Sequence, residues 1–116
     1  MVKRIVVGAH YGLRDWLVQR VTAAVMAVYT VLFVLILAAA RPTNYGAWTA
    51  LFSGQTMKLA TFLFLLSLFL HAWVGMRDIL MDYVKPVSIR LALEVVVALL
   101  LVAWAGWAIQ ILWSVR

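Results

Sequence analysis

The sequence predicts an all-α integral membrane protein with three transmembrane helices, and three observations support this fold class. Of its 116 residues, 67% are hydrophobic and only 12% are charged, whereas soluble domains are about 45–50% apolar and about 25% charged. The mean hydropathy is +1.05. Three apolar stretches reach the length of about 20 residues that a helix needs to cross the hydrocarbon core. Residues 1–116 are therefore interpreted as a single membrane domain.

The first predicted span covers residues 21–40 and contains no charged side chain. It ends before Arg41 and Pro42, because proline disfavours helical geometry in the residue that precedes it. A cleavable signal peptide is a poor interpretation of this stretch, since the apolar region of such peptides has only about 7–15 residues. Two further spans also follow it.

The second predicted span covers residues 58–77 and is bounded by Lys58 and Arg77, and the third covers residues 91–113, with Glu94 near its start. Residues 42–57 and 77–90 are expected to be loops, because both contain turn-forming or charged residues. Those in the first connection are Asn44, Gly46, Ser53 and Gly54, and those in the second are Asp78, Asp82, Tyr83, Lys85, Pro86 and Arg90.

The basic residues predict how the chain is oriented in the membrane. Seven of the ten lie in the N-terminal segment or in the second connection: Lys3, Arg4, Arg14, Arg20, Arg77, Lys85 and Arg90. Arg41, Lys58 and Arg116 lie at the other ends of the spans. Because Lys and Arg accumulate on the cytoplasmic side, we expect a cytoplasmic N-terminus and an external C-terminus. This multi-pass topology suits a bacterial cytoplasmic (inner) membrane, and the same bias would place the N-terminus in the organellar equivalent of the cytoplasm.

Two predicted helices have a stripe of small or polar residues at helical spacing, where membrane helices pack closely. The stripes are Arg20, Ala23, Ala27 and Thr30 on the first helix and Leu99, Ala103, Gly106 and Gln110 on the third. One chain of this size cannot cover all of these faces. The sequence therefore predicts partner chains, whereas the apolar composition argues against nucleic acid as a partner of this basic protein.

His71 lies inside the second span, while His10 precedes the first. An ionisable residue within the membrane is a functional candidate by default, and His71 could be a haem ligand, a proton relay or an interhelical hydrogen-bond partner. Gly75, one turn away, would leave room for a flat macrocycle. A haem bound by two histidines would need its second ligand from another chain. The chain has no cysteine, which excludes iron–sulfur clusters held by its own thiolates.

Asp82 and Tyr83 form a second candidate site near the predicted cytoplasmic interface. A phenol can donate a hydrogen bond to a quinone carbonyl, and a neighbouring carboxylate can position a basic group or transfer protons. The simpler interpretation is an interfacial aromatic residue beside a solvated charge. Both interpretations remain open from the residues alone.

Residues 71–86 closely resemble the second-helix signature of the D-type membrane anchors of succinate dehydrogenase, a succinate:quinone oxidoreductase. The matching pieces are His-Ala-Trp-x-Gly-Met at residues 71–76 and Asp-Tyr-Val-Lys-Pro at residues 82–86. Residues 14–23, Arg-Asp-Trp-Leu-Val-Gln-Arg-Val-Thr-Ala, are similar to the start of that family's first helix. The resemblance extends over nearly the whole chain.

The resemblance implies a role for four residues. His71 matches an axial ligand of haem b whose iron takes its other ligand from a C-type anchor subunit. Tyr83 matches the tyrosine that hydrogen-bonds a ubiquinone carbonyl, and Asp82 matches its neighbour in the quinone pocket. Arg20 matches a basic residue near the haem propionates.

The resemblance also implies partners: a second (C-type) membrane anchor, an iron–sulfur subunit, a flavoprotein subunit and the lipid membrane. In such a complex this chain has no catalytic residue for dicarboxylate oxidation and helps to pass electrons from the iron–sulfur subunit to quinone. Two alternatives remain from the residues alone, a proton-coupled transporter or channel subunit that uses His71, and a purely structural membrane adaptor. Transport paths usually need several buried polar groups or broken helices, and the second span has only Ser67 and His71.

Overall fold

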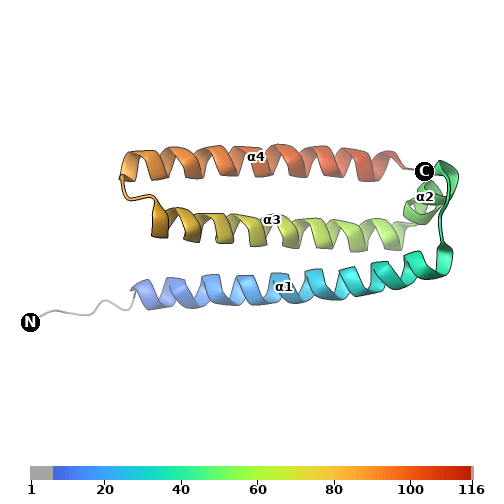
Figure 1. The fold of residues 1–116 in the computed structure, drawn as a ribbon, viewed down its shortest axis with the longest axis horizontal. Coiled ribbons are helices and arrows are strands. Elements are labelled where there is room, and N and C mark those ends of the chain that lie inside the picture. Colours follow the sequence, from blue (N-terminus) through green and yellow to red (C-terminus); the bar gives the residue numbers. More distant parts are fainter. Residues whose placement is uncertain (1–6, 116) are drawn as a thin grey trace, which may run out of the picture.

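The computed structural model describes residues 7–115, and the side chains from residue 12 onward. The described residues form four helices and no strand: α1 (Val7–Ala40), α2 (Tyr45–Ser53), α3 (Gln55–Tyr83) and α4 (Val87–Ser114) (Figure 1). Three of them, α1, α3 and α4, are long and apolar enough to cross a membrane. The predicted all-α fold with three membrane spans is confirmed.

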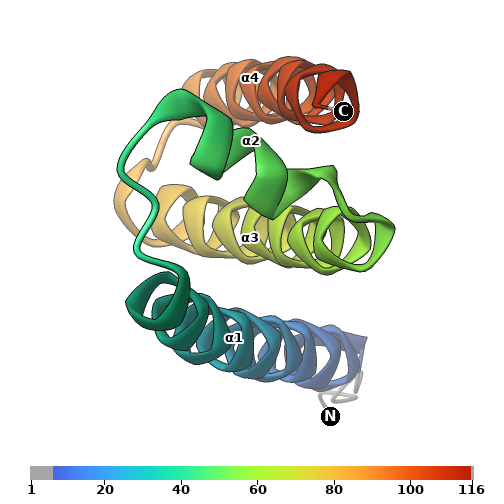
Figure 2. The ribbon, with the colours of Figure 1, turned by 90° about the vertical axis from the view of Figure 1, so that its right-hand side faces the viewer.

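The three long helices lie side by side in a single layer, with α3 between α1 and α4 (Figures 1 and 2). Packing joins α1 to α3 and α3 to α4, and the short α2 packs against α3. The start of α1 and the turn between α3 and α4 lie at one end of the layer, whereas α2 and the last residues of α4 lie at the other. The central helix α3 therefore has neighbours on two sides.

The helices are longer than the predicted spans, and the expected loop over residues 77–90 is wrong. Helix α3 continues to Tyr83, and α4 begins at Val87, so only residues 84–86 connect them. Hydropathy detects the part of a helix that lies in hydrocarbon, but a helix continues into the headgroup region until something stops it. Here Pro86 stands immediately before α4 and is its N-cap, which suits a residue without a backbone N–H.

The first connection also differs from the expectation, because it contains the nine-residue helix α2. Asn44 caps this helix, and its side-chain oxygen accepts a hydrogen bond of 2.8 Å from the backbone N–H of Ala47. Asparagine is among the preferred N-cap residues for this reason. Gly46 is therefore helical rather than part of a turn. The predicted end of the first helix at residue 40 is confirmed, with Arg41 in the left-handed conformation (φ 46°).

Helices α1 and α3 pack through polar and aromatic contacts. The hydroxyls of Tyr29 and Thr61 share a hydrogen bond of 2.8 Å. The ring of Tyr29 stacks on Phe64 of α3, with centroids 4.6 Å apart, and on Phe33 of its own helix, with centroids 5.7 Å apart. Towards the other end of the interface, Thr22 and Arg77 of the two helices take part in further polar pairs, described below. Such interhelical hydrogen bonds fix how membrane helices are aligned, because lipid competes well for apolar contacts.

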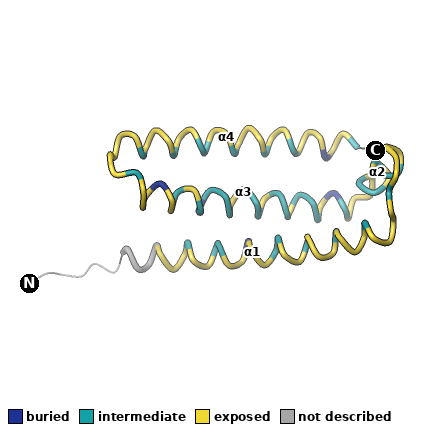
Figure 3. Tube along the Cα trace, viewed as in Figure 1, coloured by how far each residue is buried: buried dark blue, intermediate teal, exposed yellow. Residues whose placement is uncertain are grey.

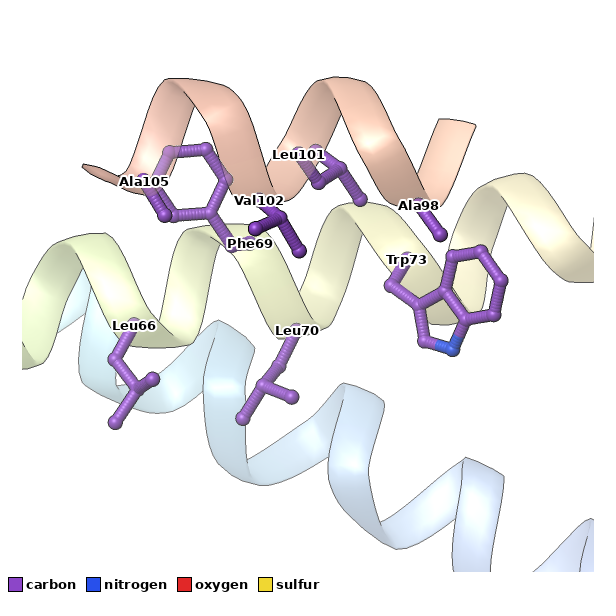
Figure 4. Close-up of a pocket in the computed structure, with 8 residues that line it drawn as sticks. All are labelled: Leu66, Phe69, Leu70, Trp73, Ala98, Leu101, Val102 and Ala105. Carbon is purple, nitrogen blue, oxygen red and sulfur yellow. The ribbon is translucent and has the colours of Figure 1, made fainter. Parts of the chain in front are cut away.

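The contact between α3 and α4 is looser. A cavity of about 210 Å³ remains between them, lined only by apolar side chains (Figure 4). The lining residues are Leu66, Phe69, Leu70 and Trp73 of α3 and Ala98, Leu101, Val102 and Ala105 of α4. At the far end, buried Lys58 donates a hydrogen bond to the carbonyl of Val115. This bond satisfies one of the carbonyls that a helix C-terminus leaves without an intrahelical partner.

Most of the described residues are exposed, as expected when the helices form a single layer (Figure 3). The buried side chains are Thr22, Lys58, Val74, Leu80 and Leu112. All eight members of the two predicted stripes are exposed, and a side chain added at Gly106 would meet nothing within 4 Å. The prediction that one chain leaves these stripes uncovered is confirmed.

We expect the Tyr29 ring to contribute more to the stability of the α1–α3 pair than its hydroxyl does. Tyr29→Phe removes the hydrogen bond and should lower the free energy of unfolding by about 0.6 kcal/mol, the average for such bonds in a membrane protein. Tyr29→Ala also removes the stacking on Phe64 of α3, worth roughly a further 0.5–1.5 kcal/mol. Reversible unfolding in mixed micelles measures both variants. Equal losses in the two would contradict this ranking.

Candidate functional site

The candidate site is centred on His71, near the middle of α3, where the imidazole faces α1. Its Nδ1 lies 3.0 Å from Oγ1 of Thr22. Thr22 is only 5% exposed, so water does not reach this contact easily. Among the described residues, the hydrogen bond of His71 is made through Nδ1, and Nε2 is therefore the ring nitrogen that could bind a metal.

Thr22 is itself held by its own helix. Its hydroxyl donates to the backbone carbonyl of Val18 at 2.6 Å, and the carbonyl of Gln19 lies at 3.2 Å. Threonine side chains in helices commonly bond to the carbonyl four residues earlier. The hydroxyl oxygen is thus fixed in place opposite His71.

One turn further along α3, Gly75 lies beside Gln19 of α1. A Cβ added at Gly75 would lie 3.5 Å from Nε2 of Gln19, an ordinary van der Waals contact. Room for a macrocycle beside Gly75 stays a prediction. The carbonyl oxygen of the same Gln19 side chain is buried and has no hydrogen-bond partner in residues 12–115.

An ion pair between Asp15 and Arg77 closes this end of the α1–α3 interface. Both side chains are about a third exposed, at 31% and 30%, so the pair adds modestly to stability. Its structural effect is to align the two helices. Together with the Thr22–His71 contact, it sets the antiparallel register in this half of the interface.

Arg20, expected near the haem propionates, is not brought close to His71 by this chain. It lies two residues from Thr22, which is about 200° around an α-helix, and it is exposed. Its guanidinium carbon lies 5.1 Å from the centre of the Trp16 ring, a cation–π arrangement. Arg20 therefore faces outward, on a different side of α1 from Thr22.

Asp82 and Tyr83 lie at the C-terminal end of α3, and both are exposed, with Tyr83 at 80%. Because α3 is continuous from Gln55 to Tyr83, the twelve residues from His71 to Tyr83 span roughly 18 Å at 1.5 Å per residue. A hollow of about 220 Å³ lies at the same end, lined by Met81, Val87, Arg90, Leu91 and Glu94. The two candidate sites are therefore separate.

Among the described side chains, His71 is the one histidine that could bind a metal ion. They contain no cluster of three or more His, Asp or Glu side chains that could hold a metal ion. His10 belongs to α1, but its side chain lies outside the described ones. Its backbone is twelve residues, or roughly 18 Å, along the helix from Thr22. A single imidazole fits an axial ligand of a haem that is shared with another chain, and does not fit a closed metal site.

Sequence reasoning found His71 but not the groups that hold it. Thr22 stands in the recognised run of residues 14–23, and Asp15 and Gln19 are in the same run. One physical requirement could have pointed to Thr22 and Gln19 from the sequence. A polar side chain within an apolar span needs a hydrogen-bond partner, and threonine or glutamine on the preceding helix is a natural one.

Comparison with known proteins gives the same family as the motifs. The family described as succinate dehydrogenase/fumarate reductase transmembrane subunit matches residues 3–106. A succinate dehydrogenase hydrophobic membrane anchor subunit of Coxiella burnetii (strain RSA 493 / Nine Mile phase I) is 48% identical over 105 residues, which cover 90% of this chain and 91% of that protein. The chain therefore belongs to the succinate dehydrogenase/fumarate reductase transmembrane-subunit family.

Proposed function

We propose that this chain is the hydrophobic membrane anchor of a succinate:quinone oxidoreductase and helps to bind haem b and ubiquinone. The observation that supports this most strongly is His71, an imidazole within an apolar span whose Nδ1 contacts Thr22 and whose Nε2 has no hydrogen-bond partner among residues 12–115. The long match to an anchor subunit supports the same role. The complex lies in a bacterial inner membrane, with the N-terminus of this chain in the cytoplasm.

Haem b would be held by Nε2 of His71 on one side and by a ligand of the C-type anchor on the other. When bound, such a haem accepts and returns single electrons. The exposed guanidinium of Arg20, backed by Trp16, suits a propionate of a group that lies between two chains. The register of α1 on α3 then has a clear role, since it keeps the imidazole in one orientation.

Ubiquinone would bind at the opposite end of α3 from Lys58, beside Tyr83. The phenol donates to a quinone carbonyl, and Asp82 could position a basic group or supply protons. Other charged groups near this end of the helices are Asp78, Lys85, Arg90 and Glu94. Reduction of quinone consumes protons, which water at the cytoplasmic face provides. The iron–sulfur subunit would meet the complex at this face and deliver electrons that the flavoprotein subunit takes from succinate.

The haem assignment predicts the behaviour of His71→Ala. In the purified complex, loss of one axial ligand should abolish the wild-type low-spin haem b spectrum or convert it to that of a ligand-deficient haem. His10→Ala is the matched control and should retain the wild-type reduced-minus-oxidised spectrum. A wild-type spectrum and midpoint potential in His71→Ala would contradict the assignment.

The quinone assignment predicts that Tyr83→Phe lowers quinone reductase activity about tenfold or more. A carbonyl left without its donor in a dry pocket loses roughly 1–3 kcal/mol, and each 1.4 kcal/mol corresponds to a factor of ten. Haem content and succinate oxidation with a soluble dye should remain unchanged. Asp82→Asn should act in the same direction, more weakly.

Tyr45→Phe is the control for Tyr83→Phe, because Tyr45 is 83% exposed and begins α2 at the other end of the layer. It should leave both activities unchanged. Steady-state kinetics with a short-chain ubiquinone and with the dye separate the two steps. Parallel loss of both activities in Tyr83→Phe would indicate damaged assembly, and normal quinone kinetics would move the site elsewhere.

The subunit assignment predicts that the exposed stripes are covered by other chains. A Cβ added at Gly106 would meet no described atom within 4 Å. Gly106→Leu should nevertheless reduce co-purification with the C-type anchor, because small residues allow close helix approach. Gly12→Leu makes the same change at another open glycine, outside the stripe, and should leave co-purification intact. Equal recovery of the partner with both variants would show that the stripe on α4 is not an interface.

A further inference from the structure

The hydroxyl of Thr22 has one hydrogen, and three neighbours could accept it. The carbonyl of Val18 lies at 2.6 Å, Nδ1 of His71 at 3.0 Å and the carbonyl of Gln19 at 3.2 Å. The carbonyl of Val18 is the closest acceptor, and bonding to the carbonyl four residues earlier is the usual behaviour of threonine in a helix. The hydrogen therefore goes to Val18, and the oxygen of Thr22 has its lone pairs available for His71.

With its hydrogen committed, Thr22 can only accept from His71. Nδ1 must then be the protonated ring nitrogen, because a neutral imidazole has one N–H donor and one acceptor. Nε2 accordingly has the free lone pair, and it points away from Thr22. Two hydrogen bonds then follow one another, from Nδ1–H of His71 to Oγ1 of Thr22 and from Oγ1–H of Thr22 to the Val18 carbonyl. Both donate in the same direction, so each bond polarises the next.

Thr30 shows that a hydrogen bond from a threonine hydroxyl to the carbonyl of the preceding turn also occurs elsewhere in α1. Its hydroxyl donates to the carbonyl of Met26 at 2.7 Å, four residues earlier, as that of Thr22 does to Val18. Thr30 is exposed, however, whereas Thr22 is buried against α3. The distinguishing feature of Thr22 is its contact with His71.

We propose that Thr22 is a positioning residue for the haem ligand. It accepts the Nδ1–H bond, holds the imidazole in the tautomer and orientation that present Nε2 to iron, and raises the basicity of that nitrogen. The proposal rests on the proposed function, in which His71 is an axial ligand. Partners of this kind typically change metal affinity 10–100-fold, and a more basic ligand favours ferric over ferrous iron.

The test compares variants of the whole complex, purified with its partner subunits. Thr22→Val keeps the shape and removes the hydroxyl, Thr22→Ala removes it with a smaller side chain should valine pack badly, and Thr22→Ser keeps it. Thr49→Val is the control, because the Thr49 hydroxyl also donates to a carbonyl of its own helix, that of Gly46 at 2.9 Å, and Thr49 lies in α2, outside both stripes. The readouts are the haem midpoint potential by redox titration, the low-spin electron paramagnetic resonance signal and haem retained after detergent washing.

Thr22→Val and Thr22→Ala should raise the midpoint potential, by 59 mV for each tenfold loss of ferric relative to ferrous affinity, and should retain less haem. Thr22→Ser and Thr49→Val should match the wild type. An unchanged potential and resonance signal in Thr22→Val and Thr22→Ala would overturn the proposal, as would a shift in Thr22→Ser equal to theirs. His71→Ala separates the two claims: if its haem spectrum is that of the wild type, the proposed function itself fails.

Discussion

The antiparallel register of α1 on α3 is the constraint on which the rest of the structure depends. Three polar pairs mark it along the interface: Asp15 with Arg77, Thr22 with His71, and Tyr29 with Thr61. In lipid, apolar side chains pack almost as well against acyl chains as against each other. Polar pairs therefore decide the alignment, and a slip by one turn would break all three at once. The same register that satisfies His71 also leaves its second ring nitrogen unengaged.

The single-layer architecture explains why the protein is a subunit. Only α3 has long helices on both sides (Figure 2), and the small-residue stripes of α1 and α4 are exposed. A haem ligated on both faces needs protein on both sides and two axial ligands. The described residues of this chain form one layer and offer one imidazole. The proposed shared haem and the exposed stripes are thus two consequences of the same incomplete bundle.

The sequence predicted the features that depend on composition and local spacing. The three spans, the end of α1 before Arg41, the exposed stripes and the position of His71 within an apolar helix all follow from one-dimensional patterns. The full lengths of α1 and α3 did not, because hydropathy locates the bilayer and not the helix ends. Helix α2 was missed although Asn44 is a good N-cap, since Gly46 and Ser53 within it and Gly54 after it were interpreted as turn formers.

The contacts between helices could not be predicted from the sequence. The sequence did not show that Gln19 of α1 lies beside Gly75. Thr22 was not singled out at all. Both facts depend on which turn of α1 meets which turn of α3, and helical periodicity within either segment has no information about that. The roles of Asp82, Tyr83 and Arg20 depend on chains beyond this one and stay predictions.

A high-resolution cryo-electron microscopy map of the complex purified through this chain tests the central claim most directly. The account predicts a haem between this chain and a second anchor, with iron bonded to Nε2 of His71 and Nδ1 within hydrogen-bonding distance of Oγ1 of Thr22. A map with haem ligated entirely by other chains, or with Thr22 turned away from a ligated His71, would contradict it.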